Sequence, residues 1–267
     1  MTVRIIVAGA TGWTGAAVTN GILDTEDLIL VAAVARRAAG DDIGTALGRG
    51  AVGVAVVASV DEALETPADL LIDLTTTSMV KEHALSAIAK GVAVLVGTSG
   101  LSAQDFADLD VAATAQGVGV FTGNLSLTAA LMQHFALEAA KHVPEFEVLD
   151  YSWADKEDVP SGTARGLAEN LGSVRQPLIA RDPATLHGPV EGRGAEINGV
   201  RVHSLRMSGF TLRCEALFGM AGERLSIAHE AGQSADPYVY GSVLVARRIG
   251  SMTGLVHGLD RLLFGDG

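Results

Sequence analysis

The sequence contains very little cysteine and lysine. One cysteine, Cys214, among 267 residues excludes an internal disulfide and a metal site built from several cysteines. We interpret Cys214 as a small buried hydrophobic residue in a protein of a reducing compartment, and we predict no metal site. Lysine occurs only four times. A lysine inside a motif, such as Lys156, is therefore a natural first candidate for a functional test.

The chain also lacks an excess of positive charge and a long hydrophobic run. Its 31 acidic and 19 basic residues give a formal net charge of -12, which argues against binding of nucleic acid. Hydrophobic residues make up 48% and the mean hydropathy is +0.33. Even so, no stretch of about 20 residues is free of charges and breakers, as a membrane-spanning helix requires. With no signal peptide before the first strand, we expect a cytoplasmic protein that binds no membrane.

Short apolar runs alternate with helical stretches through the first half of the chain. Runs closed by Gly or Asp are typical of parallel strands buried on both faces. The pattern predicts strands at 3–8, 28–35, 54–58, 70–74, 92–96 and 118–122, and helices at about 16–23, 61–64, 80–90 and 102–116. The fold class we predict is therefore α/β, with a Rossmann-type parallel sheet covered by helices.

The pattern changes after about Asn124. We predict helices at 128–142 and from 161 to about 171, a strand at 146–151, a loop over 173–195 and a last helix at 240–252. Residues 200–207, 211–218 and 224–230 alternate enough to form antiparallel strands of an open sheet. This second region is a mixed α/β segment.

A glycine-rich turn, Gly9-x-x-Gly12-x-x-Gly15, lies between the first predicted strand and helix. Such a turn lets the backbone approach a pyrophosphate, while the helix N-terminus supplies N–H groups and a positive dipole end. The spacing differs from GxGxxG, and a turn without a ligand is the alternative. We predict that this turn binds a dinucleotide through Gly9, Thr11, Gly12, Trp13 and Thr14.

The end of the second predicted strand indicates which cofactor binds. An acidic residue roughly 20 residues after the glycines would bind the ribose hydroxyls of NAD. This chain has Arg36 and Arg37 there, and a guanidinium suits a 2′-phosphate. We predict NADPH as the cofactor, with NADH as the alternative. The other interpretation is that both arginines simply face solvent.

Small and hydroxylated residues follow three further predicted strands. Because the carboxyl ends of parallel strands line the ligand crevice of an open sheet, we expect them at the nicotinamide end of the site. They are Thr75, Gly97, Thr98, Ser99, Gly123 and Asn124.

A polar loop after the strand at 146–151 leads into Lys156-Glu-Asp-Val-Pro-Ser-Gly-Thr-Ala164. Ser161 and Thr163 are typical of helix starts, and the amides of Gly162 and Thr163 are suited to hold a carboxylate. Lys156 adds a charged donor or a proton source. By spacing alone, an ordinary helix cap with a solvated lysine is the alternative.

Several motifs follow one another along nearly the whole chain. They are Gly9-x-x-Gly12-x-x-Gly15, Asp73-Leu-Thr75, Gly97-Thr-Ser-Gly100, Asn124-Leu-Ser126, Lys156-x-Asp-x-Pro-Ser-Gly-Thr-Ala164, Arg206-Met-Ser-Gly209 and Gly222-Glu-Arg-Leu-Ser-Ile-Ala-His229. Their order resembles that of the dihydrodipicolinate reductase (4-hydroxy-tetrahydrodipicolinate reductase) family of lysine biosynthesis.

The resemblance implies a division into domains and a set of residue roles. It implies a dinucleotide-binding Rossmann domain at 1–125 and 239–267, and an inserted domain at 126–238. The inserted domain would bind substrate and form a homotetramer or dimer through its open sheet. Lys156 would bind substrate and donate a proton, and Ser161, Gly162 and Thr163 would hold a substrate carboxylate.

The chain departs from this family in two places. Ser152 and Trp153 stand where the family carries a His-His pair, one of them the proposed general acid. Residues 232–236 also lack an expected substrate-binding arginine. Neither serine nor tryptophan donates a proton near neutral pH as imidazolium does. These departures suggest a different substrate, and Trp153 would favour a flatter or more apolar imine.

We therefore predict an NADPH-dependent oxidoreductase that reduces a cyclic or conjugated imine, with Lys156 as the catalytic residue. One alternative is a relative acting on another C=N substrate, as an imine reductase or amine dehydrogenase. Another is a non-catalytic protein that senses NADPH, because the glycine turn also opens proteins related to short-chain dehydrogenases. Their Tyr-x-x-x-Lys pair is absent here, since Tyr151 and Lys156 are five residues apart.

Overall fold

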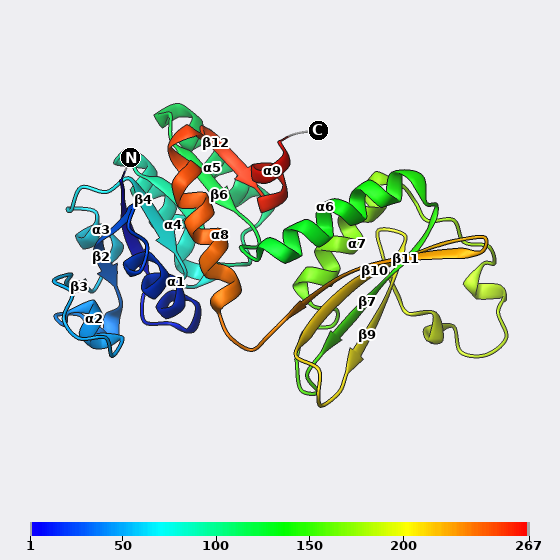
Figure 1. Cartoon of the computed structure of the whole chain (residues 1–267). Coiled ribbons are helices and arrows are strands. Elements are labelled where there is room, and N and C mark those ends of the chain that lie inside the picture. Colours follow the sequence, from blue (N-terminus) through cyan, green and yellow to red (C-terminus); the bar gives the residue numbers. More distant parts are fainter. Residues whose placement is uncertain (1, 266–267) are drawn as a thin grey trace. The chain divides into compact units, whose positions relative to one another are not determined.

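The computed structural model describes residues 2–265, which form two compact units. The first comprises the described residues up to Leu127 and from Ser234 onward, and the second comprises Thr128–Gln233 (Figure 1). None of the helices that the structure describes combines the length and apolar character needed to cross a bilayer.

The first unit is built on a seven-stranded parallel sheet with the strand order β12-β6-β5-β4-β1-β2-β3. The strands are β1 (Val3–Ala8), β2 (Leu28–Val34), β3 (Val56–Val57), β4 (Leu70–Asp73), β5 (Ala93–Val96), β6 (Gly119–Thr122) and β12 (Gly254–His257). The central strands β4, β5 and β6 are buried along their whole length. Burial on both faces explains why the sequence shows continuous apolar runs instead of alternation.

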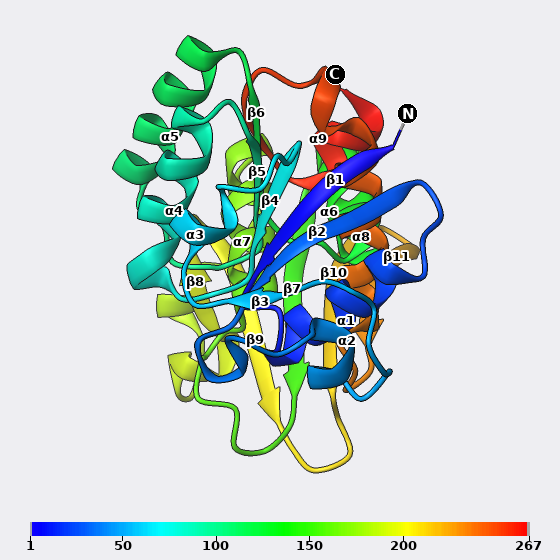
Figure 2. The same ribbon diagram turned by 90° about the vertical axis from the view of Figure 1, so that its left-hand side faces the viewer.

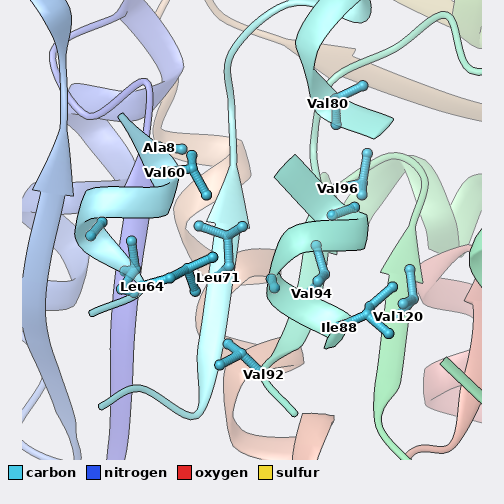
Figure 3. Close-up of a cluster of buried hydrophobic side chains, with 14 of the residues drawn as sticks. Ala8, Val60, Leu64, Leu71, Val80, Ile88, Val92, Val94, Val96 and Val120 are labelled. Atoms are coloured by element: carbon cyan, nitrogen blue, oxygen red, sulfur yellow. The ribbon is translucent and has the colours of Figure 1, made fainter. Parts of the chain in front are cut away.

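Helices cover both faces of this sheet. They are α1 (Trp13–Leu23), α2 (Ile43–Ala46), α3 (Val60–Ala63), α4 (Thr77–Ala89), α5 (Ala103–Gln116), α8 (Asp236–Arg248) and α9 (Leu259–Phe264). α3, α4 and α5 bury one face in a cluster that includes Leu71, Ile88 and Val94 (Figures 2 and 3). α1 packs against α8 on the other face (Figure 2).

Local sequence sets the ends of α5. Ser102 and Asp105 form a capping box, in which each side chain accepts a backbone N–H of the other. Gly117 ends the helix in the left-handed conformation at φ 68°. These signals explain why the helix predicted at 102–116 agrees with the structure to within a residue.

The second unit packs two helices on one face of a five-stranded mixed sheet with the order β11-β10-β7-β9-β8. Its elements are α6 (Leu127–His142), β7 (Glu145–Ser152), α7 (Gly162–Val174), β8 (Ala195–Ile197), β9 (Val200–Arg206), β10 (Leu212–Met220) and β11 (Glu223–Ala231). Along β7, buried Phe146 and Val148 face the helices. Leu149 and Tyr151 lie on the opposite, half-exposed face.

The predicted fold class is confirmed, but several elements differ from the prediction. β9 pairs parallel with β7, because the connection through α7 returns the chain to the same end of the sheet before β9 begins. The strands at 200–207, 211–218 and 224–230 are therefore not all antiparallel. The loop predicted at 173–195 contains the 3-10 turns Pro183–Thr185 and Val190–Arg193.

The C-terminal segment was also predicted incompletely. α8 begins at Asp236, where Pro237 fits the first turn, rather than at about 240. β12 and α9 follow it, so the helix predicted at 240–252 is not the last element. β12 pairs parallel with β6, so a strand from the C-terminal part of the chain forms one edge of the sheet. Only one of the four residues of β12 is buried, so β12 lacks the continuous apolar run by which β4 and β5 are recognised in the sequence.

Candidate active site

The glycine turn connects β1 to α1 through tight backbone contacts. Gly9 adopts φ +80°, and a Cβ there would lie 2.5 Å from the carbonyl oxygen of Leu74. A Cβ on Gly15 would lie only 1.9 Å from the carbonyl oxygen of Gly9. Only glycine permits this approach of α1 to the strands. The turn therefore has the shape that the sequence predicts for a pyrophosphate-binding loop.

The N-terminus of α1 is available for an anion. Gly12 is the N-cap residue and offers no side-chain hydrogen bond to the first N–H groups of the helix. Those groups carry the positive end of the helix dipole. Trp13 starts the helix with 63% of its surface exposed, and its ring meets Tyr238 edge-on at 6.1 Å. Thr11 and Thr14 belong to the same turn.

The two candidate arginines lie close to this turn in the fold. The N–H of Gly9 donates to the carbonyl oxygen of Val34 at 3.0 Å, so the turn adjoins the end of β2. Arg36 and Arg37 follow β2 in a short 3-10 turn, and both are exposed. Within residues 2–265 neither forms an ion pair. Both guanidinium groups remain available to a phosphate.

Two of the three strand ends predicted at the nicotinamide side are joined by one buried carboxylate. Asp73, the last residue of β4, is fully buried. Its Oδ1 accepts hydrogen bonds from the N–H (2.9 Å) and Oγ1 (2.6 Å) of Thr75 and from the Oγ1 of Thr98 (3.3 Å). Asp73 thus links the residues after β4 to the loop of Gly97, Thr98 and Ser99 after β5.

His83 completes this cluster, and the sequence analysis missed it. Its Nδ1 lies 2.7 Å from Oδ2 of Asp73, although His83 is on α4, ten residues along the chain. No spacing rule connects a strand-end carboxylate to the second turn of the following helix. The packing of α4 against β4 brings the two side chains into contact.

Asn124 and Gly123 follow β6 at the same edge of the sheet. The Oδ1 of Asn124 accepts the N–H of Ser126 at 2.9 Å, which fixes the turn. Beside them, Thr122 Oγ1 and His257 Nδ1 are 2.7 Å apart. Burial is the largest cause that lowers the pKa of His257, so its imidazole is neutral at physiological pH.

In the second unit, Lys156 lies between an aromatic ring and a carboxylate. We call residues 153–163 the substrate loop. The Nζ of Lys156 is 2.5 Å from Oδ1 of Asp158 and 4.8 Å from the ring centre of Trp153. The Lys156 side chain is only 16% exposed. Trp153, predicted as a substrate contact, thus makes a cation–π contact with the candidate catalytic lysine.

Ser161, Gly162 and Thr163 form the start of α7, as the sequence predicts. Ser161 Oγ accepts the N–H of Ala164 at 3.3 Å and donates to Oδ1 of Asp150 at 2.7 Å. The N–H of Ser161 donates to Oδ2 of Asp150 at 2.9 Å. Asp150, on β7, is fully buried. The position of the helix start is therefore set by a carboxylate beneath it in the sheet.

Arg206 holds the same carboxylate from β9, and the sequence analysis missed this pair. Its Nη2 donates to Oδ2 of Asp150 and to the carbonyl oxygen of Asp158, both at 2.8 Å. Ser204 Oγ also donates to Asp150, at 3.1 Å. Burial raises the pKa of the Asp150 carboxyl, but hydrogen bonds from Ser161 and Arg206 outweigh it and hold the pKa below its usual value.

Two further histidines of this unit have structural partners. His203 Nε2 lies 2.6 Å from Oε2 of Glu147 on the half-exposed face of the sheet. His229 is buried, and its Nδ1 lies 3.0 Å from Oγ1 of Thr128. Desolvation lowers the pKa of His229, so it is neutral at physiological pH. Neither of these two contacts involves Lys156.

The predicted residues therefore gather into two sets. Every predicted cofactor residue lies in the first unit, and Lys156, Trp153, Ser161, Gly162 and Thr163 lie in the second. A buried carboxylate holds part of each set: Asp73 holds Thr75 and Thr98 in the first, and Asp150 holds Ser161 in the second. Sequence reasoning assigned no role to the two carboxylates or to their partners His83 and Arg206.

Comparison with known proteins points to one family for both units. The family described as dihydrodipicolinate reductase, N-terminus, matches residues 3–125, and its C-terminal counterpart matches residues 128–263. A 4-hydroxy-tetrahydrodipicolinate reductase of Desulfitobacterium hafniense is 36% identical over 264 residues, covering 98% of each chain. One from Moorella thermoacetica is 35% identical over 266 residues, again covering 98% of each.

Solved structures point to the same family and fold. A dipicolinate-bound dihydrodipicolinate reductase from Paenisporosarcina superposes with a TM-score of 0.86 at 25% identity, covering 98% of this chain and 100% of that one. GenD2 of gentamicin A biosynthesis, in complex with NAD, superposes with a TM-score of 0.63 at 15% identity, covering 93% of this chain and 86% of its own. The second likeness concerns the fold alone.

Proposed function

The chain belongs to the dihydrodipicolinate reductase family and is an NAD(P)H-dependent oxidoreductase of that type, and from this premise we propose that it reduces 4-hydroxy-tetrahydrodipicolinate. The observation that carries the proposal is the substrate loop, where Lys156 and the start of α7 offer a cation and backbone N–H groups to a carboxylate. We assign cofactor binding to the first unit and substrate binding to the second. This function would place the protein in lysine biosynthesis.

For the cofactor, we propose NADPH in preference to NADH. The contacts around Gly9 and Gly15, which a Cβ would fill, suit a pyrophosphate group. Arg36 and Arg37 suit a 2′-phosphate, because both guanidinium groups are exposed. We expect KM for NADPH to be at least about tenfold below KM for NADH. Equal constants, or a preference for NADH, would contradict this part of the proposal.

When bound, the nicotinamide supplies a hydride. This chain's own residues bind and orient the substrate and supply the proton. Lys156 presents its Nζ as a proton source, and Trp153 covers it. Asp73 holds the hydroxyls of Thr75 and Thr98 at fixed positions beside the nicotinamide end of the cofactor site. Ser161 starts α7 so that the N–H groups of Gly162 and Thr163, which have no partner within the helix, point to where a substrate carboxylate would bind.

Ser152 does not replace a proton-donating histidine. It is fully buried, and its Oγ donates to the carbonyl oxygen of Thr211 at 2.9 Å. Trp153 carries no acidic proton near neutral pH. Lys156 is therefore the proton donor of this proposal, and the absence of a histidine pair supports the second candidate function, reduction of another C=N substrate.

One assay separates these functions. NADPH oxidation is measured with 4-hydroxy-tetrahydrodipicolinate and with a panel of cyclic and conjugated imines with and without carboxylates. We expect the highest kcat/KM with the hydroxy-tetrahydrodipicolinate. A higher value with another imine would identify an imine reductase, and reduction that requires ammonia and a ketone would identify an amine dehydrogenase. Tight NADPH binding without turnover of any substrate would indicate a sensor.

We also propose that the half-exposed face of the five-stranded sheet forms a subunit interface of a homotetramer or dimer. Leu149, Tyr151, Leu205 and Leu217 share this face and are only partly covered. Phe210 packs against Tyr151 with ring centres 5.2 Å apart, which adds to the apolar area. Partly exposed aliphatic and aromatic residues on one sheet face are typical of a surface that a second copy covers.

A further inference from the structure

Asp158 is the only carboxylate that pairs with Lys156 among residues 2–265. The distance of 2.5 Å from Nζ to Oδ1 is that of a direct, charge-assisted contact. Burial raises the pKa of Asp158, but the Lys156 side chain, followed by the N–H groups of Asp158 itself and of Gly162, outweighs this effect and leaves the pKa lowered. The carboxylate of Asp158 thus interacts with the two kinds of group proposed above to hold a substrate carboxylate.

The two members of this pair differ in exposure. The Lys156 side chain is 16% exposed, whereas half of the Asp158 side chain is exposed. Asp158 can therefore turn into solvent and be rehydrated, while Lys156 stays beneath Trp153. A pair with one half-exposed member contributes little net stability, so an incoming anion can replace it at small cost.

The backbone around Asp158 is fixed independently of its side chain. Its carbonyl oxygen accepts a hydrogen bond from Nη2 of Arg206 at 2.8 Å. Three residues later, Ser161 is held through both its N–H and its Oγ by the buried Asp150. The substrate loop would thus keep its shape while the Asp158 side chain moves.

We propose that Asp158 is an internal carboxylate that occupies the position of a substrate carboxylate between Lys156 and the start of α7, and that substrate displaces it on binding. The inference rests on the proposed function, because only a substrate that carries a carboxylate competes for this position. Asp158 would then act as a specificity residue. A ligand without a carboxylate cannot replace it and leaves the Lys156–Asp158 pair intact.

The opposing role for Asp158 is to orient Lys156 throughout the reaction. The two roles predict opposite changes in KM for Asp158→Asn, a substitution that removes the charge and keeps the size of the side chain. If Asp158 competes with substrate, the variant lowers KM about fivefold, the upper range expected for a half-exposed ion pair, and changes kcat less than twofold. If Asp158 orients Lys156, the variant raises KM or lowers kcat.

The experiment combines kinetics with calorimetry of a defined probe. Dipicolinate, a flat dicarboxylate, is titrated into wild type, Asp158→Asn and Asp158→Ala in the presence of NADPH. The uncharged pyridine-2,6-dicarboxamide serves as the ligand control. Glu157→Gln is the matched variant, because Glu157 is exposed, neighbours Asp158 and forms no ion pair among the described residues. Thermal unfolding confirms that each variant is folded.

We expect both Asp158 variants to bind dipicolinate about fivefold more tightly, with Glu157→Gln within twofold of wild type. Affinity for the dicarboxamide should not rise in the Asp158 variants. Unchanged or weaker dipicolinate binding in those variants, with active wild type, would overturn the inference alone. If wild type neither binds dipicolinate nor oxidises NADPH with the proposed substrate, the proposed function fails, and the inference fails with it.

Discussion

At the scale of single residues, Lys156 is the side chain to which we assign the chemistry of the second unit. It is one of four lysines in the chain, it is largely buried, and it meets both Trp153 and Asp158. A cation in such a position is placed to bind an anion or to release a proton toward it. Removal of the Lys156 amino group should therefore slow the chemical step and leave the binding of the cofactor unchanged.

We expect Lys156→Met to lower kcat/KM for the proposed substrate by at least about a hundredfold, because general-acid contributions are of that order. Methionine preserves the length and apolar stem of the side chain. NADPH affinity, measured by fluorescence titration, should stay within about twofold of wild type. A variant that keeps a tenth or more of wild-type turnover would exclude Lys156 as the proton donor.

Gly15 illustrates a residue whose role is the absence of a side chain. In Gly15→Ala the new Cβ would lie 1.9 Å from the carbonyl oxygen of Gly9, so α1 or the turn has to move. We expect a loss of about 1–3 kcal/mol in unfolding free energy, as for overpacked sites, and at least tenfold weaker NADPH binding.

The matched control for this change is Gly166→Ala. Gly166 lies within α7, and a Cβ there meets nothing within 4 Å. Because alanine favours helix, it should stabilise the fold by about 0.5–1 kcal/mol and leave NADPH affinity unchanged. Equal effects of both substitutions in denaturant titrations would contradict the close-approach argument.

At the scale of elements, α7 is attached to the sheet by charge as well as by apolar packing. Leu167 and Leu171 belong to the core cluster between α7 and the sheet. Asp150 on β7 and Arg206 on β9 add a buried ion pair directly under the first residue of the helix. Breaking such a pair from one side leaves the other charge uncompensated.

Asp150→Asn should therefore reduce the unfolding free energy at pH 7 by about 3 kcal/mol. The folded-state pKa of Asp150 is lowered, so its stabilising contribution is present above the unfolded pKa of about 3.9 and is lost as pH falls through the folded pKa. The difference between wild type and variant should narrow below about pH 4. If the difference in unfolding free energy stays constant from pH 7 to pH 3, the charge of Asp150 contributes nothing to stability. Asp155→Asn, at an exposed position, is the control.

At the scale of the whole molecule, the open sheet face should determine the subunit number. Leu205→Glu places a charge among Leu149, Tyr151 and Leu217, and we expect the mass measured by light scattering to fall to that of a monomer. Ala228→Arg, at an exposed position of β11 on the same face, is a second variant that disturbs the fold less. Val111→Glu on the exposed side of α5 should leave the mass unchanged.

If wild type is itself a monomer at micromolar concentration, the proposed interface is wrong. The same holds if both sheet variants keep the wild-type mass while folded, as shown by circular dichroism. If Val111→Glu also lowers the mass measured by light scattering, then an added charge at any surface position disrupts the assembly, and the sheet face has no special role.

The amino-acid sequence by itself determined the alternation of strands and helices, the glycine turn and the substrate loop. These features are local, because burial on both faces gives a continuous apolar run, because Gly9 needs a positive φ and Gly15 approaches Gly9 within the same turn, and because Ser161 caps its own helix. The family resemblance is carried by the same local motifs, and comparison with known proteins confirmed it.

Only the tertiary structure decided which residues hold those motifs in place. His83 meets Asp73 across ten residues, and Arg206 meets Asp150 across 56. β9 pairs parallel with β7, and β12 pairs with β6, although each pair is far apart in the sequence. Strand pairing and buried ion pairs depend on how distant segments cross in space, and a pattern read along one segment does not contain that information.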